Sequence, residues 1–243
     1  MKFALAASSL ALVAGASARS ITVTNKCSYT VWPAIYTGSG TAPSQTTGWQ
    51  ANTGDTVTFD VPDNWTAGRI WGRRDCDASG TCVTGNCAGG IVCTQPGTPP
   101  ATLAEFTLAA SGNQDFYDVS LVDGFNIPVA ITNDQGCSTA DCPVDLNANC
   151  PAELQGPSGA SGNEGCKSAC FANLDGNPTD SANCCSGSHA TQATCPSSGV
   201  TDYSYFKNAC PNSYCYAYDE ASGTALWTCD AGKAASYTVT FCP

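Results

Sequence analysis

Alternating apolar and polar residues predict β-strands along much of the chain. In segment 20–25, Ile21 and Val23 stand between polar residues, and segment 236–241 repeats the pattern. Because successive side chains of a strand point to opposite faces, a period of two is typical of half-buried strands. The same reasoning predicts strands at residues 28–32, 56–61, 68–73, 104–108, 115–121 and 128–131. Short strands separated by Gly, Pro and Asn turns favour an all-β sandwich.

The pattern changes at Cys137. Nine cysteines fall between Cys137 and Cys210, while strand periodicity disappears and Gly, Ser, Asn and Pro dominate. Disulfides, rather than a large apolar core, hold a segment of this composition. We predict a disulfide-rich subdomain at 137–215, with short helices around 163–172 and 203–209. The other expected units are a small disulfide loop subdomain at 76–93 and a sandwich core made of 19–75, 94–136 and 216–243.

The first 18 residues have the pattern of a secretory signal peptide. Met1-Lys2 is a short basic start, an apolar run follows from Phe3 to Gly15, and Ala16-Ser17-Ala18 provides the small residues of a cleavage site. We predict that the mature chain begins at Arg19 and is secreted to the extracellular space or cell wall, without a membrane anchor. The 17 cysteines agree with an oxidising compartment.

Charge narrows the classes of partner. The formal net charge is −11, with only nine Lys and Arg residues, so nucleic acid and anionic membranes would repel the chain. A neutral ligand such as a polysaccharide carries no such penalty. Acidity also serves solubility alone, which is the competing interpretation.

We expect neither a cofactor nor a metal site. The sequence has no C-x-x-C pair, and its one histidine, His189, lies in a Gly/Ser-rich stretch far from any nucleophile motif. We interpret His189 as a surface residue rather than as part of a Ser-His-Asp triad.

Several motifs occur in an order that resembles the thaumatin-like proteins, the pathogenesis-related group 5 type, over the whole mature chain. The N-terminal motif at 25–32 is followed by Gly-Arg-Ile-Trp-Gly-Arg at 68–73. Further matches lie at 80–87, 103–108, 117–126, 205–220 and 239–243. Asn86 stands where an Asp is usual in the family.

The resemblance implies a β-sandwich core, a subdomain of disulfide-rich loops and short helices, a small disulfide-closed loop subdomain, and eight disulfides. The implied pairs are Cys27 with Cys242, Cys76 with Cys82, Cys87 with Cys93, Cys137 with Cys229, Cys142 with Cys210, Cys150 with Cys166, Cys170 with Cys184, and Cys185 with Cys195. Cys215 is left over. It is either a reactive thiol or a buried small residue, and its position between Tyr214 and Tyr216 favours the second.

The resemblance also implies a cleft with one Arg, one Glu and three Asp, which binds β-1,3-glucans and hydrolyses them slowly. The matching residues are Arg69, Glu105, Asp118, Asp123 and, in the last position, Asp219, with Glu220 as the neighbouring alternative. Without the resemblance, each acid would be interpreted as a strand-end or turn residue bonded to local backbone donors.

Carboxylates are the catalytic groups that glycoside hydrolysis needs, one as general acid and one as base or nucleophile. Glu105 stands in an apolar strand, where burial raises a carboxyl pKa, so we assign it as the acid and Asp123 as the second carboxylate. We expect substrate to be bound by Arg69, Asp118, Asp219, Phe125 and Tyr117. Aromatic residues near these elements either stack on sugar rings or belong to the core: Tyr117, Phe125, Tyr205, Phe206 and Tyr216.

The sequence therefore predicts a monomeric, secreted β-1,3-glucan-binding protein with weak endo-β-1,3-glucanase activity. The alternatives are a non-catalytic glucan-binding protein and a defence protein that acts on fungal walls or inhibits another enzyme. Asn64-Trp65-Thr66 is an N-glycosylation sequon, either occupied or an unmodified turn.

Overall fold

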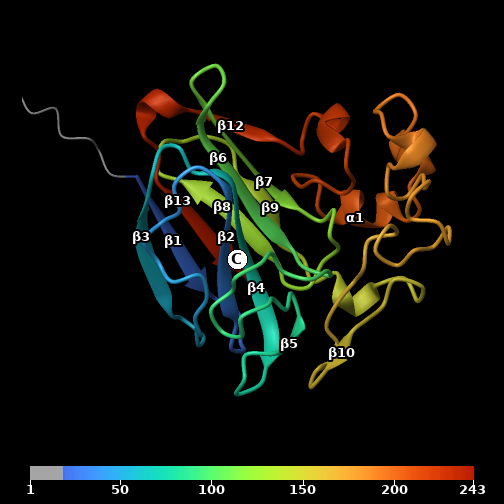
Figure 1. The fold of residues 1–243 in the computed structure, drawn as a ribbon, viewed down its shortest axis with the longest axis horizontal. Helices are drawn as coiled ribbons and strands as arrows, with labels where there is room; N and C mark the ends of the chain where they lie inside the picture. Colours follow the sequence, from blue (N-terminus) through green and yellow to red (C-terminus); the bar gives the residue numbers. More distant parts are fainter. Residues whose placement is uncertain (1–18) are drawn as a thin grey trace, which may run out of the picture.

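Two β-sheets pack face to face in the computed structural model, which describes residues 19–243; the predicted signal peptide lies outside them (Figure 1). The first sheet has the strand order β3 (Thr56–Val61), β1 (Arg19–Asn25), β13 (Tyr237–Phe241), β8 (Val129–Asn133) and β9 (Ala140–Cys142). The second has the order β12 (Trp227–Asp230), β7 (Gln114–Ser120), β6 (Leu103–Ala110), β4 (Thr66–Cys76) and β2 (Trp32–Ser39), and β5 (Cys82–Thr84) pairs with β4.

The alternation seen in the sequence decides which face of the first sheet is buried. Ile21 and Val23 of β1 are buried against the second sheet. Thr22, which lies between them, faces outward and shares a hydroxyl hydrogen bond of 2.9 Å with Thr58 on β3. Strands β1 and β13 run parallel, whereas the other pairs of the two sheets are antiparallel.

Aromatic side chains fill the space between the sheets. The Tyr237 ring lies 5.4 Å from that of Phe106 and 5.1 Å from that of Tyr117, measured between centroids. Tyr117 and Phe125 have no exposed surface. Both residues were predicted to bind substrate, and the structure places them in the core instead.

A buried ionic group joins the sheets at one end. Arg19 of β1 donates from Nη1 to Asp115 of β7 at 2.6 Å, and the Tyr237 hydroxyl donates to the other carboxylate oxygen at 2.8 Å. The Asp115 side chain is fully buried. The first residue of the predicted mature chain is thus part of the contact between the layers.

One predicted strand and one predicted helix differ from the structure, both in segments that turns and disulfides shape. The predicted strand at 28–32 is wrong over most of its length: residues 28 and 29 form a bend, Val31 makes only an isolated bridge with Ala51, and the strand runs from Trp32 to Ser39. The predicted helix at 163–172 is also wrong: Cys166 pairs with Phe125 in an extended bridge, and only turns follow. The helix predicted near 203–209 is confirmed as α1 (Tyr203–Ala209).

Short elements and disulfides build the segment that follows β9, drawn in yellow and orange in Figure 1. They are η1 (Asn147–Asn149), β10 (Ser158–Gly159), β11 (Gly162–Asn163), η2 (Gly187–His189), η3 (Ser197–Gly199), α1 and η4 (Asp219–Ser222); η5 (Ala231–Lys233) lies further on, between β12 and β13. Leu146, Leu154 and Phe206 pack on the main core. Strand β9 extends the first sheet past Cys137, where the predicted subdomain begins.

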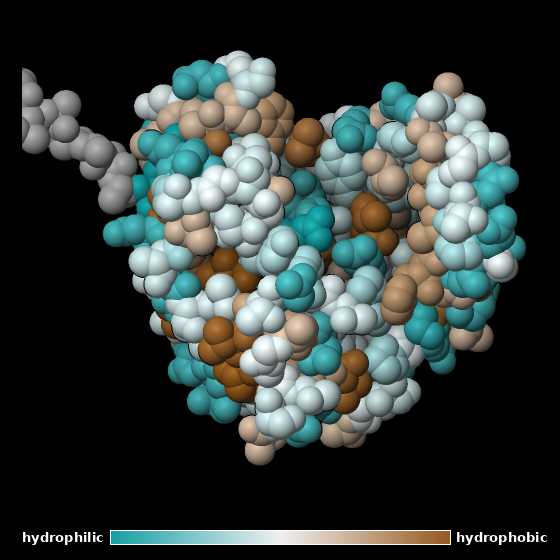
Figure 2. All heavy atoms as spheres, in the orientation of Figure 1, coloured by the Kyte–Doolittle hydropathy of each residue, from teal (hydrophilic) through white to brown (hydrophobic). Residues whose placement is uncertain are grey.

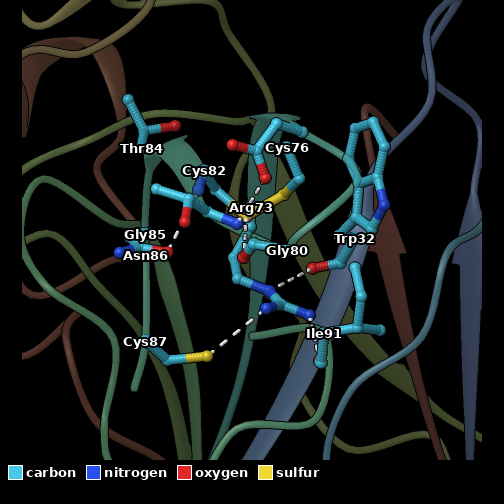
Figure 3. The surroundings of a disulfide bond; sticks show 12 residues. Trp32, Arg73, Cys76, Gly80, Cys82, Thr84, Gly85, Asn86, Cys87 and Ile91 are labelled. Atoms are coloured by element: carbon cyan, nitrogen blue, oxygen red, sulfur yellow. Dashed lines mark hydrogen bonds between the residues drawn. A yellow bond between two sulfur atoms is a disulfide. The ribbon is translucent and has the colours of Figure 1, made fainter. Parts of the chain in front are cut away.

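All eight predicted disulfides are present with the predicted partners. The Cys27–Cys242 bond links the start and end of the sandwich. Figure 3 shows the small loop, where Arg73 reaches toward Trp32, Cys87 and Ile91. Its guanidinium donates to the carbonyls of Trp32 and Ile91 at 3.0 and 2.8 Å, so a buried cation holds the loop through backbone oxygens.

Two surface features bear on location and processing. Within residues 19–243, no helix is long and apolar enough to cross a bilayer. Asn64 is exposed in the turn before β4, where its Nδ2 donates to the Thr41 hydroxyl at 3.1 Å. Glycosylation of this asparagine remains a prediction.

Candidate functional site

Three adjacent strands place Arg69, Glu105 and Asp118 in one row. In the sheet register, Arg69 of β4 is opposite Glu105 of β6, which is opposite Asp118 of β7. Residues paired across neighbouring strands share a face, and here it is the outer face, because the next residues along each strand point into the core. The sheet itself therefore brings these three side chains together.

Arg69 and Glu105 form an ion pair at the surface of this row. Arg69 Nε lies 2.9 Å from Glu105 Oε1, and the two side chains remain 37% and 27% exposed. Solvent therefore reaches both groups. Nearby solvent weakens such a pair, so its main effect is to orient the carboxylate.

A turn after β7 and the segment after α1 complete the cleft. Gly124 adopts φ 84°, a conformation that glycine tolerates, and closes the turn that carries Asp123. Tyr214 lies along the end of β7, where its N–H donates to Val119 O at 2.9 Å. The cleft has a volume of about 380 Å³ and is lined by Arg69, Leu103, Glu105, Asp118, Ser120, Val122, Asp123, Tyr214 and Ala217. Figure 2 shows the hollowed surface between the sandwich and the disulfide-rich part.

Burial raises the pKa of each of the three acids in the cleft. For Glu105, desolvation raises the pKa, Arg69 opposes this, and the charge of Asp123 adds to it. Desolvation also raises the pKa of Asp123, again against the effect of Arg69. The pKa of Asp118 lies well above its ordinary value, because of burial first and the neighbouring Glu105 second. Within residues 19–243, no donor bonds to Asp118 Oδ1. The carboxyl groups of the cleft therefore hold their protons more strongly than exposed carboxyl groups do.

Asp219 does not join this row. Its side chain is 1% exposed and accepts hydrogen bonds from Lys207 Nζ at 3.0 Å, from the Tyr203 hydroxyl at 2.7 Å and from the N–H of Cys215 at 2.9 Å. These contacts fix the segment after α1. The adjacent Glu220 is exposed, and its charge contributes to raising the pKa of Asp118, after burial and Glu105. The correction is that Glu220, not Asp219, is the acid of this pair near the cleft.

The predicted stacking residues are largely core residues. Phe206 and Tyr216 are buried, and the partly buried Tyr205 donates its hydroxyl to Leu146 O at 2.6 Å. The aromatic residue that does line the cleft is Tyr214, which was not among the predicted stacking residues. A Tyr-rich stretch next to the acidic pair indicated that a tyrosine lies near the cleft, but the sequence could not show which tyrosine faces the sheet.

An apolar pocket of about 160 Å³ continues the cleft beyond Asp123. It shares Val122, Asp123 and Ala217 with the cleft, and Phe171 and Val200 lie on its wall. The end of the cleft at this pocket is therefore more apolar than its acidic centre.

Cys215 borders the apolar pocket and is predicted to be chemically inert. Among residues 19–243 it is the cysteine outside the disulfides, and burial, with the charge of Asp219, raises its pKa to about 12. Because the thiolate is the reactive form, we expect no labelling of the native protein by a thiol reagent at pH 8, and one label per chain after unfolding without reduction. Rapid labelling of the native protein would contradict this assignment.

Other groups fall outside the cleft. His189 lies on η2, where its Nδ1 is 3.0 Å from Thr194 O. Residues 19–243 contain no group of three or more His, Cys, Asp or Glu side chains arranged to hold a metal ion.

The two-sheet sandwich, its eight disulfides and the acidic cleft together define a thaumatin-like fold. The family model described as the Thaumatin family matches residues 25–243, and the chain belongs to this family. It is 45% identical over 236 residues to pathogenesis-related thaumatin-like protein 3.5 of Cryptomeria japonica, covering 94% of this chain and 91% of that protein. It is 44% identical over 239 residues to a protein of Prunus avium named glucan endo-1,3-beta-glucosidase, covering 94% and 92%.

One solved structure with the same fold is the laminaripentaose-producing β-1,3-glucanase of GH family 64 from Paenibacillus barengoltzii, in complex with laminarihexaose. The TM-score is 0.55 at 11% identity, covering 92% of this chain and 74% of the other. At this identity the likeness concerns the fold.

The raised pKa of Asp118 predicts a specific dependence of stability on pH. A carboxyl group whose pKa is higher in the folded protein stabilises it at low pH, and this contribution is lost as the pH rises through the folded pKa. At pH 8, Asp118→Asn is therefore expected to increase the free energy of unfolding by roughly 1–2 kcal/mol. At pH 3, where the carboxyl is protonated in both states, the difference should vanish. Chemical denaturation at both pH values measures this, and a less stable variant at pH 8 would refute it.

Proposed function

We propose that this protein is a secreted, monomeric β-1,3-glucan-binding protein that hydrolyses its ligand slowly in the acidic cleft. The observation that carries the proposal is the row of Arg69, Glu105 and Asp118 on an open face, with Asp123 at its end and three carboxyl pKa values raised by burial. The glucanase name of one relative supports the same ligand.

The residues have distinct roles in this proposal. Protonated Glu105 donates its proton to the glycosidic oxygen as the bond to the sugar breaks. Ionised Asp123 either takes a proton from the water that attacks the anomeric carbon, or attacks that carbon itself to form a glycosyl ester that water then hydrolyses. Arg69 orients Glu105 and donates hydrogen bonds to sugar hydroxyls through its remaining N–H groups. The face of the Tyr214 ring packs on a glucose ring.

Recognition without cleavage is the second candidate, and the ion pair favours it. Arg69 at 2.9 Å lowers the pKa of Glu105 against the larger effect of burial, which reduces the protonated fraction that a general acid needs. The two candidates share the site and the ligand and differ only in turnover. A defence role through the wall polysaccharide is compatible with either.

Binding is tested by a pull-down of the disulfide-intact protein on insoluble β-1,3-glucan, with cellulose as the control polysaccharide. We expect retention on the β-1,3-glucan at low and high salt, because the polymer is neutral. Arg69→Ala should weaken retention, whereas Asp60→Ala, at an exposed carboxylate of β3, should not. Equal retention on both polysaccharides, or release by salt, would argue against the proposal.

A further inference from the structure

A second pair of carboxyl groups lies outside the cleft, where the end of β4 meets the hairpin 158–163, formed by β10 and β11. Asp75 belongs to β4, and Glu164 follows β11 directly. Asp75 Oδ2 accepts a hydrogen bond from the Ala160 N–H at 2.7 Å, and Glu164 Oε1 accepts one from the Ser161 N–H at 3.1 Å. Both carboxyl groups therefore hold the tip of the same hairpin.

The two carboxyl groups come together over Gly159. A Cβ atom added at Gly159 would lie 2.4 Å from Glu164 Oε2 and 2.7 Å from Asp75 Oδ2, so only glycine leaves room for both oxygens. Asp75 has φ 48°, a region that non-glycine residues rarely adopt, which indicates a position fixed by its surroundings. The backbone conformations at Gly159 and Asp75 therefore both position the two carboxyl groups close to each other.

One of the two oxygens of Glu164 lacks the hydrogen-bond partner that a buried carboxylate needs. The side chain has no exposed surface, and within residues 19–243 no hydrogen bond reaches its Oε2. An ionised oxygen in such a place is costly, because nothing replaces the water it has lost. A proton on either carboxyl group removes this cost, since the protonated oxygen donates to the other group.

The surrounding charges leave room for one proton. Arg74 Nη2 lies 3.6 Å from Glu164 Oε1, and its guanidinium stacks over the Tyr29 ring at 4.4 Å. Burial raises the pKa of Tyr29, Arg74 opposes this, and the charge of Asp145 raises the pKa further. The phenol therefore stays neutral. Among the described residues, Arg74 is thus the one cation beside the two carboxyl groups of Asp75 and Glu164, and Asp145 adds a further negative charge nearby. One proton shared by Asp75 and Glu164 leaves a single negative charge on the pair, which Arg74 balances.

We propose that Asp75 and Glu164 share one proton and form a pH-sensitive latch that holds the hairpin 158–163 on the end of strand β4. When the proton leaves, two carboxylates face each other across Gly159, and their repulsion loosens the hairpin. The latch joins the sandwich to the disulfide-rich part at a place separate from the glucan cleft.

The direction of the pH effect follows from the same contacts. Burial raises the pKa of Glu164 above its ordinary value, the Ser161 N–H opposes this, and the neighbouring Asp75 carboxyl adds to it. The latch is therefore closed in acid, and it opens as the pH rises through the pKa of the folded protein.

A carboxyl-detected NMR titration of the full mature protein, with disulfides intact, tests the latch. We expect Glu164 to titrate above the ordinary glutamate range, and Asp75→Asn to lower its pKa by about one unit or more, because one of the two competing charges is gone. Asp77→Asn, at an exposed carboxylate of the adjoining loop, should leave Glu164 unchanged. Titration of Glu164 in the ordinary range would overturn the proposal.

Hydrogen exchange reports the opening itself. After correction for intrinsic exchange, the amides of Ala160 and Ser161 should lose roughly tenfold in protection as Glu164 ionises. In Glu164→Gln the protection should no longer change with pH over that range, and Asp75→Asn provides the same test if the glutamine variant does not fold. Hairpin protection in the parent protein that does not respond to Glu164 ionisation would also overturn the latch.

Discussion

Replacing Glu105 by glutamine is expected to reduce the release of reducing sugar from a soluble β-1,3-glucan by about a thousandfold. Glutamine keeps the size of the side chain and its position opposite Arg69 and Asp118, but its amide protons are not acidic enough to be transferred to the glycosidic oxygen. Retention on insoluble β-1,3-glucan should persist. The measurement is a reducing-sugar assay run beside the pull-down on the same protein preparations.

The control for this experiment is Asp60→Asn, which changes one exposed carboxylate far from the row and should leave turnover intact. A Glu105→Gln variant that releases sugar at the parent rate would show that Glu105 is not the acid. If the parent protein binds glucan without releasing sugar, the cleft recognises its ligand without cutting it, and the second candidate function is correct.

The largest effect on stability is expected at Asp115. Its carboxylate has no exposed surface and accepts hydrogen bonds from Arg19 Nη1 at 2.6 Å, the Tyr237 hydroxyl at 2.8 Å and the Ala109 N–H at 2.9 Å. Asp115→Ala leaves the buried Arg19 cation without this partner. Removal of one partner of a buried ion pair costs roughly 3–5 kcal/mol.

Chemical denaturation with disulfides intact measures this loss. The matched comparison is Asp60→Ala, which removes a carboxylate from an exposed position of a neighbouring strand and should change the free energy of unfolding by less than about 0.5 kcal/mol. Similar losses for the two variants would mean that the contact between the sheets at Arg19 contributes little to stability.

The sequence predicted strands well where one face of a strand is buried and the other is wet. Strand β3 matches the expected bounds, and β1 and β13 differ by one residue, because alternating residues such as Ile21 and Val23 report directly on the buried face. Strands β9 and β12 were missed. They have only three and four residues, too few to show a period, and their pairing with β8 and β7 decides their conformation.

The failed helix at 163–172 has a similar cause. Its spacing is compatible with a helical turn, but Cys166 is held in a disulfide with Cys150 and in an extended bridge with Phe125. These long-range contacts override the local preference. A single sequence shows that the cysteines are present without showing their partners, which is why the disulfide pairs came from the family resemblance.

The candidate site was predictable only in part. Arg69, Glu105 and Asp118 came from the family resemblance, and the structure explains why they meet: β4, β6 and β7 pair in register and carry these outward residues in one row. Asp219 and Glu220 were not distinguishable in the sequence. Neighbours at the start of a 3₁₀ helix point in different directions, and only the contacts of Asp219 with Lys207 and Tyr203 show which carboxylate is buried.

The central claim is that the acidic cleft binds β-1,3-glucan, and NMR titration of the isotope-labelled protein with a soluble β-1,3-gluco-oligosaccharide tests it most directly. We predict saturable shifts of the amides of Arg69, Glu105, Asp118, Asp123 and Tyr214, which all line the cleft. The same titration of Arg69→Ala should show weaker affinity with the same pattern. Shifts confined to another surface, or no saturable shifts, would contradict the account.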